Sequence, residues 1–429
     1  MERQWRRRSG FRRRSGVALA LGALLQLGLP GSAEAENLPD VDLDPSDRVL
    51  ALEERGCGET QTAEPRCSDL AVALGRQRGT RARTFGEATA TLPAKLRTEC
   101  DVKAEDIGWP ATWIRCFDRA DTDQTEWLTQ GIAGTGEWRT AESPGARQHY
   151  LIATWCWRGS EGIDEADVCN REEPVKRTRI SLISVDRNAY RNVELVEPYL
   201  EQAAGRSPVV ASRGILLHAG GAAIAGRWLY VADTEWLYVF NLDHFLQSGD
   251  RPYQLPVWAR YVIADPADRE RNNPFSSISI DGSGDEPRLV AAEYRLDSRE
   301  DALVTVWPLE RDGRLPDARP VRTTRSYTID GGGPIDRVQG VAAHGDTFLF
   351  AESAETIERA PAGARRQAGD RCIKWGDGTG EDLYASAGED VVVGINEGFL
   401  ATGSTFWAVP YRSAFGLEPP PQGYPRRDC

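Results

Sequence analysis

The chain has 429 residues, of which 40% are hydrophobic and 27% charged, and this composition is typical of a folded globular protein. It carries 52 Lys and Arg against 65 Asp and Glu, a net charge of -13. This acidic balance argues against a nucleic-acid-binding protein, which needs cations to replace the counterions along phosphates. No apolar run in the sequence approaches the roughly 20 residues that cross a bilayer, so we expect no membrane span.

Residues 1–35 are predicted to be a secretory signal peptide. Seven Arg lie within its basic start, Val17–Leu29 is a short apolar segment, and Ala33–Ala35 matches a small-residue cleavage site. The alternative is a membrane anchor, but the apolar segment is too short for one. Arg13 and Arg14 also fit a twin-arginine signal, so both export routes stay open. We expect a secreted protein, either extracellular or periplasmic.

All eight Cys lie after the predicted cleavage site, and an even number of Cys in an exported chain indicates disulfide bonds. A zinc site is the alternative, but no Cys or His cluster has the spacing of metal ligands. The sequence does not determine the pairing. Our hypothesis joins neighbours in chain order: Cys57–Cys67, Cys100–Cys116, Cys156–Cys169 and Cys372–Cys429.

Residues 36–105 are predicted to be a disulfide-containing extension of mixed coil and helix, with a helix at Asp69–Arg76. The remaining residues, 106–429, contain five similar units, each of which begins with a strand of small residues and a Gly turn. These first strands are expected at 130–136, 220–226, 276–282, 339–345 and, in a looser copy, 382–388.

A second strand, rich in β-branched and aromatic residues, follows each first strand. The second strands are expected at 150–155, 228–233, 288–293, 348–352 and 391–395. Third strands are expected at 180–185, 236–241, 302–309, 356–360 and 405–409. Fourth strands are expected at 191–196, 259–264, 324–329 and 372–375.

Five units of about four strands predict an all-β fold, a five-bladed β-propeller that follows the N-terminal extension. Small first-strand residues suit this fold because the innermost strands crowd around a narrow axis. The fifth unit lacks a clear fourth strand, and we expect Ala111–Phe117 to join it and close the ring, which removes exposed sheet edges. A β-sandwich or jelly roll is the alternative, but neither requires a recurrent strand of small residues.

In a propeller, the starts of the first strands and the ends of the second strands meet at one face. Carboxylates end three second strands there, and His218 precedes a first strand. Because glycoside hydrolysis uses paired carboxylates, we predict catalytic roles for Asp233, Glu293 and Glu352, with His218 as a general base or metal ligand. The predicted ligand-binding residues are Gln130, Trp155, Ser276, Gln339, Glu381 and Asp382.

Structural roles are open alternatives for the same residues. Carboxylates at strand ends often cap turns or pair with Arg, and Trp155 can pack against a disulfide of Cys156 instead of stacking on a sugar. The carboxylates can also hold Ca²⁺, which prefers several hard oxygen ligands, and we expect no other cofactor. An acidic loop with Asp118, Asp121, Asp123 and Glu126 is a second calcium candidate, with a solvated loop as its alternative.

Several stretches resemble a group of secreted bacterial β-propeller proteins that has no established activity. They are 130–132, 193–198, 218–221, 229–233, 239–242, 289–294, 306–309, 338–340 and 380–383. The resemblance spans about residues 110–412 and implies the fold and the export, but it assigns no catalytic residue.

The sequence therefore predicts a secreted β-propeller with a polar, acidic ligand site at one mouth of its central channel. The first hypothesis for its function is a hydrolase or lyase that acts on an extracellular carbohydrate. The alternative is a non-catalytic propeller that binds a carbohydrate or a protein. We expect the partner to be an extracellular small molecule or polysaccharide, and the protein to be a monomer.

Overall fold

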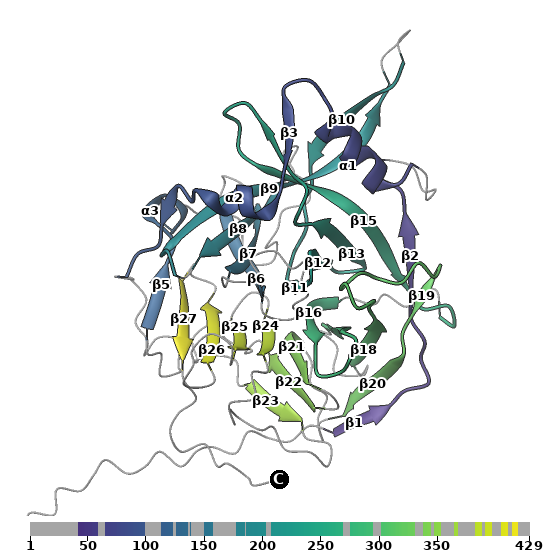
Figure 1. Ribbon diagram of the computed structural model, residues 1–429. Helices are drawn as coiled ribbons and strands as arrows, with labels where there is room; N and C mark the ends of the chain where they lie inside the picture. Colours follow the sequence, from purple (N-terminus) through teal and green to yellow (C-terminus); the bar gives the residue numbers. More distant parts are fainter. Residues whose placement is uncertain are drawn as a thin grey trace, which may run out of the picture. The chain divides into compact units, whose positions relative to one another are not determined.

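Among the residues that the computed structural model describes, strands predominate, and three short helices lie toward the N-terminal end of the chain (Figure 1). The structure is all-β, with a nearly closed, barrel-like arrangement of its strands. It describes residues 42–58, 65–98, 113–122, 126–135, 138, 150–157, 177–184, 186–202, 207–268, 275–294, 302–330, 338–344, 347–352, 364–367, 382–387, 391–396, 405–410 and 414–418. The predicted signal peptide lies outside these residues.

The five predicted first strands are confirmed. Each lies at one end of its sheet, and each contacts the next in a cycle that returns to the start. In the order of that cycle they are β6 (Trp127–Gly134), β11 (Gly221–Ala225), β16 (Phe275–Asp281), β21 (Val338–His344) and β24 (Asp382–Ala387). They therefore form a ring.

Glycine allows the strands of this ring to approach one another closely. A Cβ atom on Gly131 of β6 would lie 2.8 Å from the carbonyl oxygen of Gly220, just before β11. A Cβ atom on Gly221 of β11 would lie 2.6 Å from the backbone nitrogen of Ile278 in β16. These contacts are with backbone, which has no rotamer to change, so no larger residue fits without a shift of a whole strand.

Each first strand is followed by antiparallel partners in chain order. The first sheet continues with β7 (Tyr150–Trp157), β8 (Thr178–Ser184) and β9 (Ala189–Glu201). The second continues with β12 (Trp228–Asp233), β13 (Trp236–Asn241) and β15 (Gln254–Ala264). The third continues with β17 (Arg288–Glu293), β18 (Ala302–Pro308) and β20 (Arg325–Asp330). A short parallel pairing between β15 and β9 joins the first two sheets.

The last two sheets differ from the expectation in detail. The fourth contains β22 (Thr347–Glu352) and β23 (Ala364–Gln367), so its third strand comes later than the range 356–360, which lies outside the described residues, as does 372–375. The fifth contains β25 (Val391–Asn396), β26 (Thr405–Pro410), β27 (Ala414–Glu418) and finally β5 (Trp113–Cys116). The upstream strand does join the last sheet, as predicted, but the fourth position belongs to β27, which the sequence analysis missed.

Apolar side chains from neighbouring sheets meet face to face. One core cluster joins Ile180 of β8 to Val231 of β12, and a second joins Tyr230 of β12 to Leu289 of β17. A third cluster joins the third sheet to the fourth, where Val304 packs in the same group as Val341 and Phe348. The hydrophobic core therefore lies between consecutive sheets, outside the ring of first strands.

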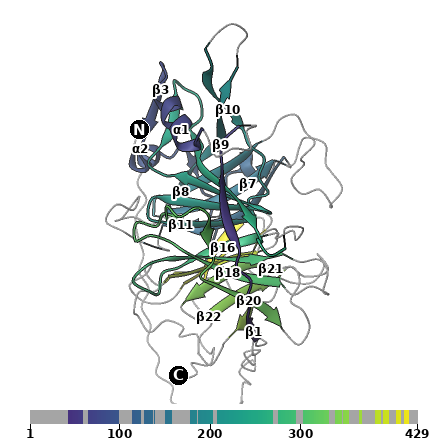
Figure 2. The same cartoon turned by 90° about the vertical axis from the view of Figure 1, so that its right-hand side faces the viewer.

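The N-terminal extension adds outer strands to the repeated sheets. The strand β1 (Asp42–Pro45) pairs with β20, beside which it lies in Figure 2, and β2 (Ala51–Arg55) pairs with β15. The helix α1 (Cys67–Gly75), close to the predicted range, contacts β15 and β9. The disulfide Cys57–Cys67 is confirmed and links the segment after β2 to the start of this helix.

The disulfide segment is held by a buried ion-pair network. Arg260 of β15 donates hydrogen bonds to the carbonyl oxygens of Gly56 and Gly58 at 2.7 and 3.0 Å. The same guanidinium lies 2.8 Å from Glu197 of β9, whose other oxygen pairs with Arg213 at 2.8 Å. Because Glu197 has a side chain only 6% exposed, these partners compensate the cost of burying its charge.

We predict that Gly221→Ala destabilises the fold by roughly 1–3 kcal/mol or more, because the new methyl group collides with the β16 backbone. The control is Gly284→Ala, where the nearest atom to a new Cβ lies at an ordinary contact distance of 3.6 Å. Urea unfolding of the oxidised protein measures both effects. Equal midpoints for the two variants would show that the first strands are not tightly packed.

Candidate functional site

The predicted site residues occupy matched positions in the pairing register. At the end of the second strands, Trp155, Glu293, Glu352 and Asn396 pair with Thr129, Phe275, Val338 and Asp382 near the starts of the first strands. Asp233 ends the corresponding strand β12 of the second sheet. We call this end of the ring, where first strands start and second strands end, the mouth.

Three of the first strands are bulged at the mouth. The register shifts at Gln130 and Gly131 in β6, at Ser276 in β16 and at Gln339 in β21. These are residues that the sequence analysis proposed as ligand contacts. Bulges interrupt strand pairing and re-aim side chains, and they are over-represented next to active sites and at barrel rims.

One hydroxyl group joins the first two sheets at the mouth. The backbone N–H of Gly131 donates to Oγ1 of Thr154 on β7 at 2.7 Å. The same hydroxyl donates to the carbonyl oxygen of Ala219 at 2.8 Å, in the loop that leads into β11. Thr154 is fully buried, so these bonds fix the bulge of β6 against the loop of the next sheet.

Gln130 is buried at this bulge without protein partners. Its side chain is only 1% exposed, and neither its amide nitrogen nor its amide oxygen bonds to any of the residues that the structure describes. A buried amide without a hydrogen bond costs free energy, and native proteins rarely leave one unexplained. A bound ligand or ordered water at the mouth is the usual explanation for such a group.

His218 and Asp233 lie together, as their positions predicted. The carboxylate Oδ1 of Asp233 accepts a hydrogen bond from the backbone N–H of His218 at 2.7 Å. The neighbouring residues Ala219 and Thr234 have φ angles of 56° and 54°, a left-handed conformation that non-glycine residues rarely adopt. Strained backbone of this kind clusters at functional sites, and here it flanks both candidate residues.

Glu293 lies inside the third sheet. Its side chain is 0% exposed, and Oε2 accepts a hydrogen bond from the backbone N–H of Leu303, one residue into β18, at 3.1 Å. The carboxylate thus continues the hydrogen bonding between β17 and β18 beyond their last paired residues. This contact is a structural role of the kind that the sequence analysis left open for carboxylates at strand ends. Because its side chain is enclosed, Glu293 does not face the solvent at the mouth.

Trp155 is also buried in the core and does not contact a ligand at the mouth. The side chain is 0% exposed, and its indole N–H donates to Oγ of Ser181 at 2.8 Å. Phe117 packs edge-on against the ring at 4.6 Å between centroids, and the guanidinium of Arg179 lies 4.5 Å from its centroid. With these contacts the indole has no face left for a sugar ring, because the core already covers it.

The remaining predicted site residues are described only in part. Ser276, Gln339, Glu352 and Asp382 lie in strands at the mouth, where only their backbone is described, and Glu381 lies outside the described residues. Their predicted roles stay predictions. Cys156 is disulfide-bonded, and its predicted pairing with Cys169 stays a prediction.

The acidic loop at 118–126 does not offer a calcium site at Asp121. Its carboxylate accepts from Arg179 at 2.7 Å, from the hydroxyl of Tyr190 at 2.6 Å and from Asn192 at 2.9 Å. The Arg179 guanidinium lies between Trp155 and Trp127, 4.4 Å from the latter ring, and repels any second cation. Among the described residues, no group of three or more His, Cys, Asp or Glu is placed to hold a metal ion.

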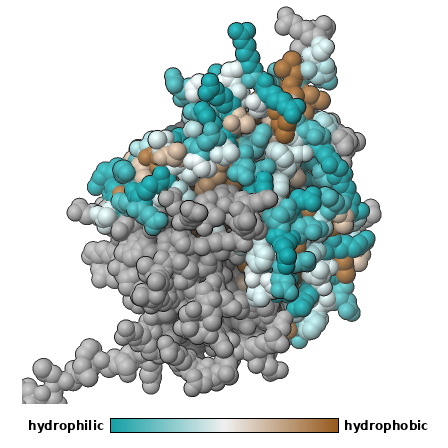
Figure 3. All heavy atoms as spheres, viewed as in Figure 1, coloured by the Kyte–Doolittle hydropathy of each residue, from teal (hydrophilic) through white to brown (hydrophobic). Residues whose placement is uncertain are grey.

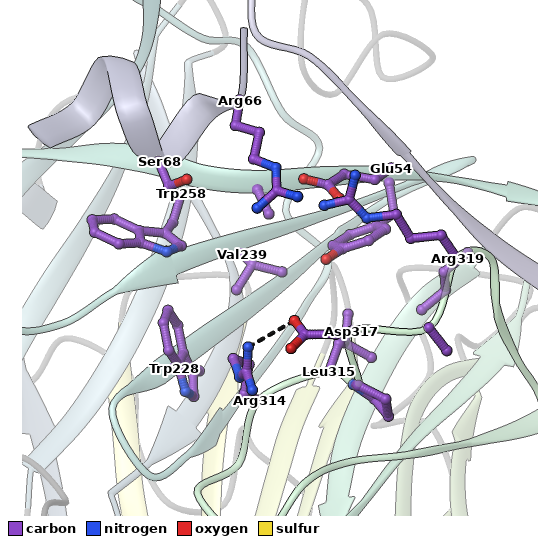
Figure 4. A pocket seen from close by; sticks show the side chains of 15 residues that line it. Glu54, Arg66, Ser68, Trp228, Val239, Trp258, Arg314, Leu315, Asp317 and Arg319 are labelled. Carbon is purple, nitrogen blue, oxygen red and sulfur yellow. Dashed lines mark hydrogen bonds and ion pairs between the residues drawn. The ribbon is translucent and has the colours of Figure 1, made fainter. Parts of the chain in front are cut away.

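A pocket on the second sheet was not predicted. Its lining includes Trp228, Trp258 and Tyr261 from β12 and β15. Figure 4 shows the two tryptophans together with Arg314 and Arg319 from the loop that follows β18. The pocket has a volume of about 110 Å³. A register shift between Val239 and Phe240 marks a bulge opposite Trp258. Alternation along β15 does not reveal this bulge, so the sequence pattern gave no signal for the pocket.

No protein-family model and no curated protein sequence matches this chain. The resemblance to secreted bacterial propeller proteins therefore stays a prediction. No described helix is long and apolar enough to span a membrane. The described surface in Figure 3 is mainly hydrophilic, in keeping with the high charged fraction.

We predict that Glu293→Ala lowers the free energy of unfolding by about 1–3 kcal/mol, because the Leu303 N–H loses its buried acceptor. The control Glu293→Gln keeps an amide oxygen at the same position and retains more of the stability. Urea unfolding measures both variants. An unchanged midpoint for Glu293→Ala would argue against this structural role.

We also predict a loss of stability at alkaline pH. Burial, followed by the hydrogen bond to Asp121, raises the pKa of Tyr190 well above its ordinary 10.0. The folded state therefore keeps a proton that the unfolded state loses, so the contribution is complete below about pH 10 and falls as pH rises above it. For one such group the slope reaches about 1.4 kcal/mol per pH unit.

Urea unfolding between about pH 8 and pH 11 tests this prediction. Tyr190→Phe should have a shallower pH dependence than the unmodified protein. Burial also raises the pKa values of Tyr230, Tyr238 and Tyr261. These residues account for the pH dependence of stability that remains in the variant. Identical slopes in both proteins would contradict the assignment to Tyr190.

Proposed function

We propose that this protein is an exported five-bladed β-propeller that binds an extracellular ligand at its mouth without turning it over. The five first strands that contact one another in a cycle support the blade number, because each starts one repeated unit. The core clusters between consecutive sheets support the same arrangement, since blades pack face to face in a propeller. A β-sandwich does not account for a cycle of five first strands with core clusters between consecutive sheets.

Export rests on two observations. The segment 1–35 has the composition of a signal peptide, and the Cys57–Cys67 bond belongs to a chain whose Cys are even in number. Disulfides persist in the periplasm and outside the cell, whereas cytosolic thiols are kept reduced.

Binding is favoured over catalysis by what the described carboxylates do. Asp233 and Glu293 each accept a hydrogen bond from a backbone N–H group, at 2.7 and 3.1 Å. A glycosidase needs two carboxyl groups that flank the scissile bond across an open space, about 5–10 Å apart. Glu293 is enclosed by its own sheet, so this pair of residues does not supply that arrangement.

The main support for a ligand site at the mouth is the environment of Gln130. Its amide is buried at a bulge beside the strained His218–Gly220 loop, with no bond to the described residues. An amide offers both donors and an acceptor, so it suits a hydroxyl-rich or amide-bearing ligand. We therefore propose that a carbohydrate or another polar extracellular molecule binds there.

A glycan array and a hydrolysis screen on the purified protein test this proposal. We expect binding without release of reducing sugar. Gln130→Met should weaken the binding by about tenfold or more, while stability stays equal or rises because an unpaired buried amide is removed. The control is Gln202→Met, at an exposed position.

Two outcomes would contradict the proposal. Release of reducing sugar by the unmodified protein, abolished in Asp233→Asn or Glu352→Gln, would establish an enzyme. Equal glycan binding by Gln130→Met and the unmodified protein would place the ligand away from the mouth.

A further inference from the structure

The pocket on the second sheet shares no lining residue with the mouth. It brings together two indole rings, a tyrosine and three guanidinium groups (Figure 4). We propose that it binds a sugar ring that bears a carboxylate, presented as the terminal residue of an extracellular polysaccharide.

Aromatic side chains form one side of the pocket. Trp228 and Trp258 lie 6.2 Å apart between ring centroids and are tilted by 56°, and Figure 4 shows both on the same side. Trp228 is 8% exposed, whereas Trp258 at the bulge of β15 is only partly buried. Trp258 therefore offers the accessible indole surface, which suits the apolar C–H face of a sugar ring.

Arginine side chains surround the rest of the pocket. Arg314 pairs with Asp317 at 2.8 Å, and Arg319 pairs with Glu54 at 2.8 Å. The first pair is solvent-exposed, with side chains 44% and 86% accessible, so it is weak and exchanges readily for a ligand carboxylate. The second pair includes Glu54, which is 13% accessible, so Arg319 is held in place as part of the wall.

Guanidinium groups supply the positive charge of this pocket, in a chain whose net charge is -13. Arg314 is held by carboxylates that are themselves exposed, Asp317 at 2.8 Å and Asp312 at 3.9 Å. A guanidinium group binds a carboxylate through two parallel hydrogen bonds, which gives both orientation and strength. The surrounding negative charge opposes the approach of a long polyanion, so a single acidic residue at a chain end fits better.

The size of the pocket leads to the same conclusion. Its volume of about 110 Å³ is smaller than the roughly 300–1,000 Å³ of pockets that enclose drug-sized ligands. It therefore holds one ring, and the rest of a longer ligand stays in solvent.

The disulfide connects two walls of this pocket. Cys67 lies between the lining residues Arg66 and Ser68, and it is bonded to Cys57, which follows the β2 residue Glu54. Oxidation therefore fixes the start of α1 relative to β2. We expect binding to be strongest in the oxidised protein, the form that persists outside the cytosol.

Isothermal titration calorimetry of the purified, oxidised protein with glucuronate and galacturonate tests the proposal, with glucose and inorganic phosphate as comparison ligands. We expect a uronate to bind more tightly than either comparison ligand. Arg314→Gln should weaken uronate binding by about tenfold or more, as expected for loss of a charge-assisted hydrogen bond. The matched control is Arg311→Gln, an exposed position in the same loop that does not line the pocket.

Trp258→Ala separates the aromatic contribution, and it should abolish binding of the sugar while thermal unfolding shows that the fold persists. Gln202→Met, at an exposed position outside the pocket lining, should leave uronate binding unchanged. Loss of uronate binding in Trp258→Ala but not in Gln202→Met locates the ligand at this pocket and not at the mouth. Equal uronate affinity in the unmodified protein and Arg314→Gln would overturn the proposal. Phosphate binding as tight as uronate binding, or no uronate binding at all, would overturn it as well.

Discussion

Direct contact between the backbones of neighbouring first strands is the constraint on which this structure depends. Gly131 faces the carbonyl oxygen of Gly220, and Gly221 faces the backbone of Ser277 and Ile278, with no room for a Cβ atom. Where strands meet this closely, their sheets can diverge outward and bury side chains between their faces. The core clusters lie in those spaces.

The close approach of the first strands also determines which hydrogen bonds the polar groups at the mouth form. Strands that end so near one another leave backbone N–H groups that need acceptors, and nearby carboxylates and hydroxyls supply them. Asp233 accepts from His218, Glu293 accepts from Leu303, and Thr154 joins Gly131 to Ala219. The matched carboxylates Asp233 and Glu293 thus accept backbone hydrogen bonds, whereas neither amide atom of the buried Gln130 bonds to the described residues.

The N-terminal extension adds elements to the outer edge of the fold that do not belong to the repeated units. The strands β1 and β2 extend the third and second sheets, and α1 packs on β15 and β9. The disulfide and the Arg260–Glu197 pair hold this segment in place. A pocket with aromatic and cationic walls arises where β2, α1 and the loop before β19 (Val321–Arg322) meet the second sheet, so it belongs to this chain's additions and not to the repeat.

The sequence by itself determined the strands, because their signals are local. Small residues before a Gly turn, followed by β-branched and aromatic runs, placed all five first strands and the second strands close to their observed bounds. It also placed the candidate residues at matched positions, because they occupy the same place in each repeated unit. It missed β27, which pairs with β26 and with the upstream strand β5, and it missed the later third strand β23, which a long connection separates from β22.

Only the tertiary structure decided what the individual side chains do. Burial and hydrogen bonding depend on neighbours that are distant in the chain: Leu303 for Glu293, Phe117 and Arg179 for Trp155, and Ala219 for Thr154. The pocket likewise needs residues from positions 52 to 319, together with a bulge that strand alternation does not encode. The pattern of residues in a sequence predicts which side chains share one face of a strand. The solvent exposure of each side chain and its hydrogen-bonding partners are determined only when the sheets pack together.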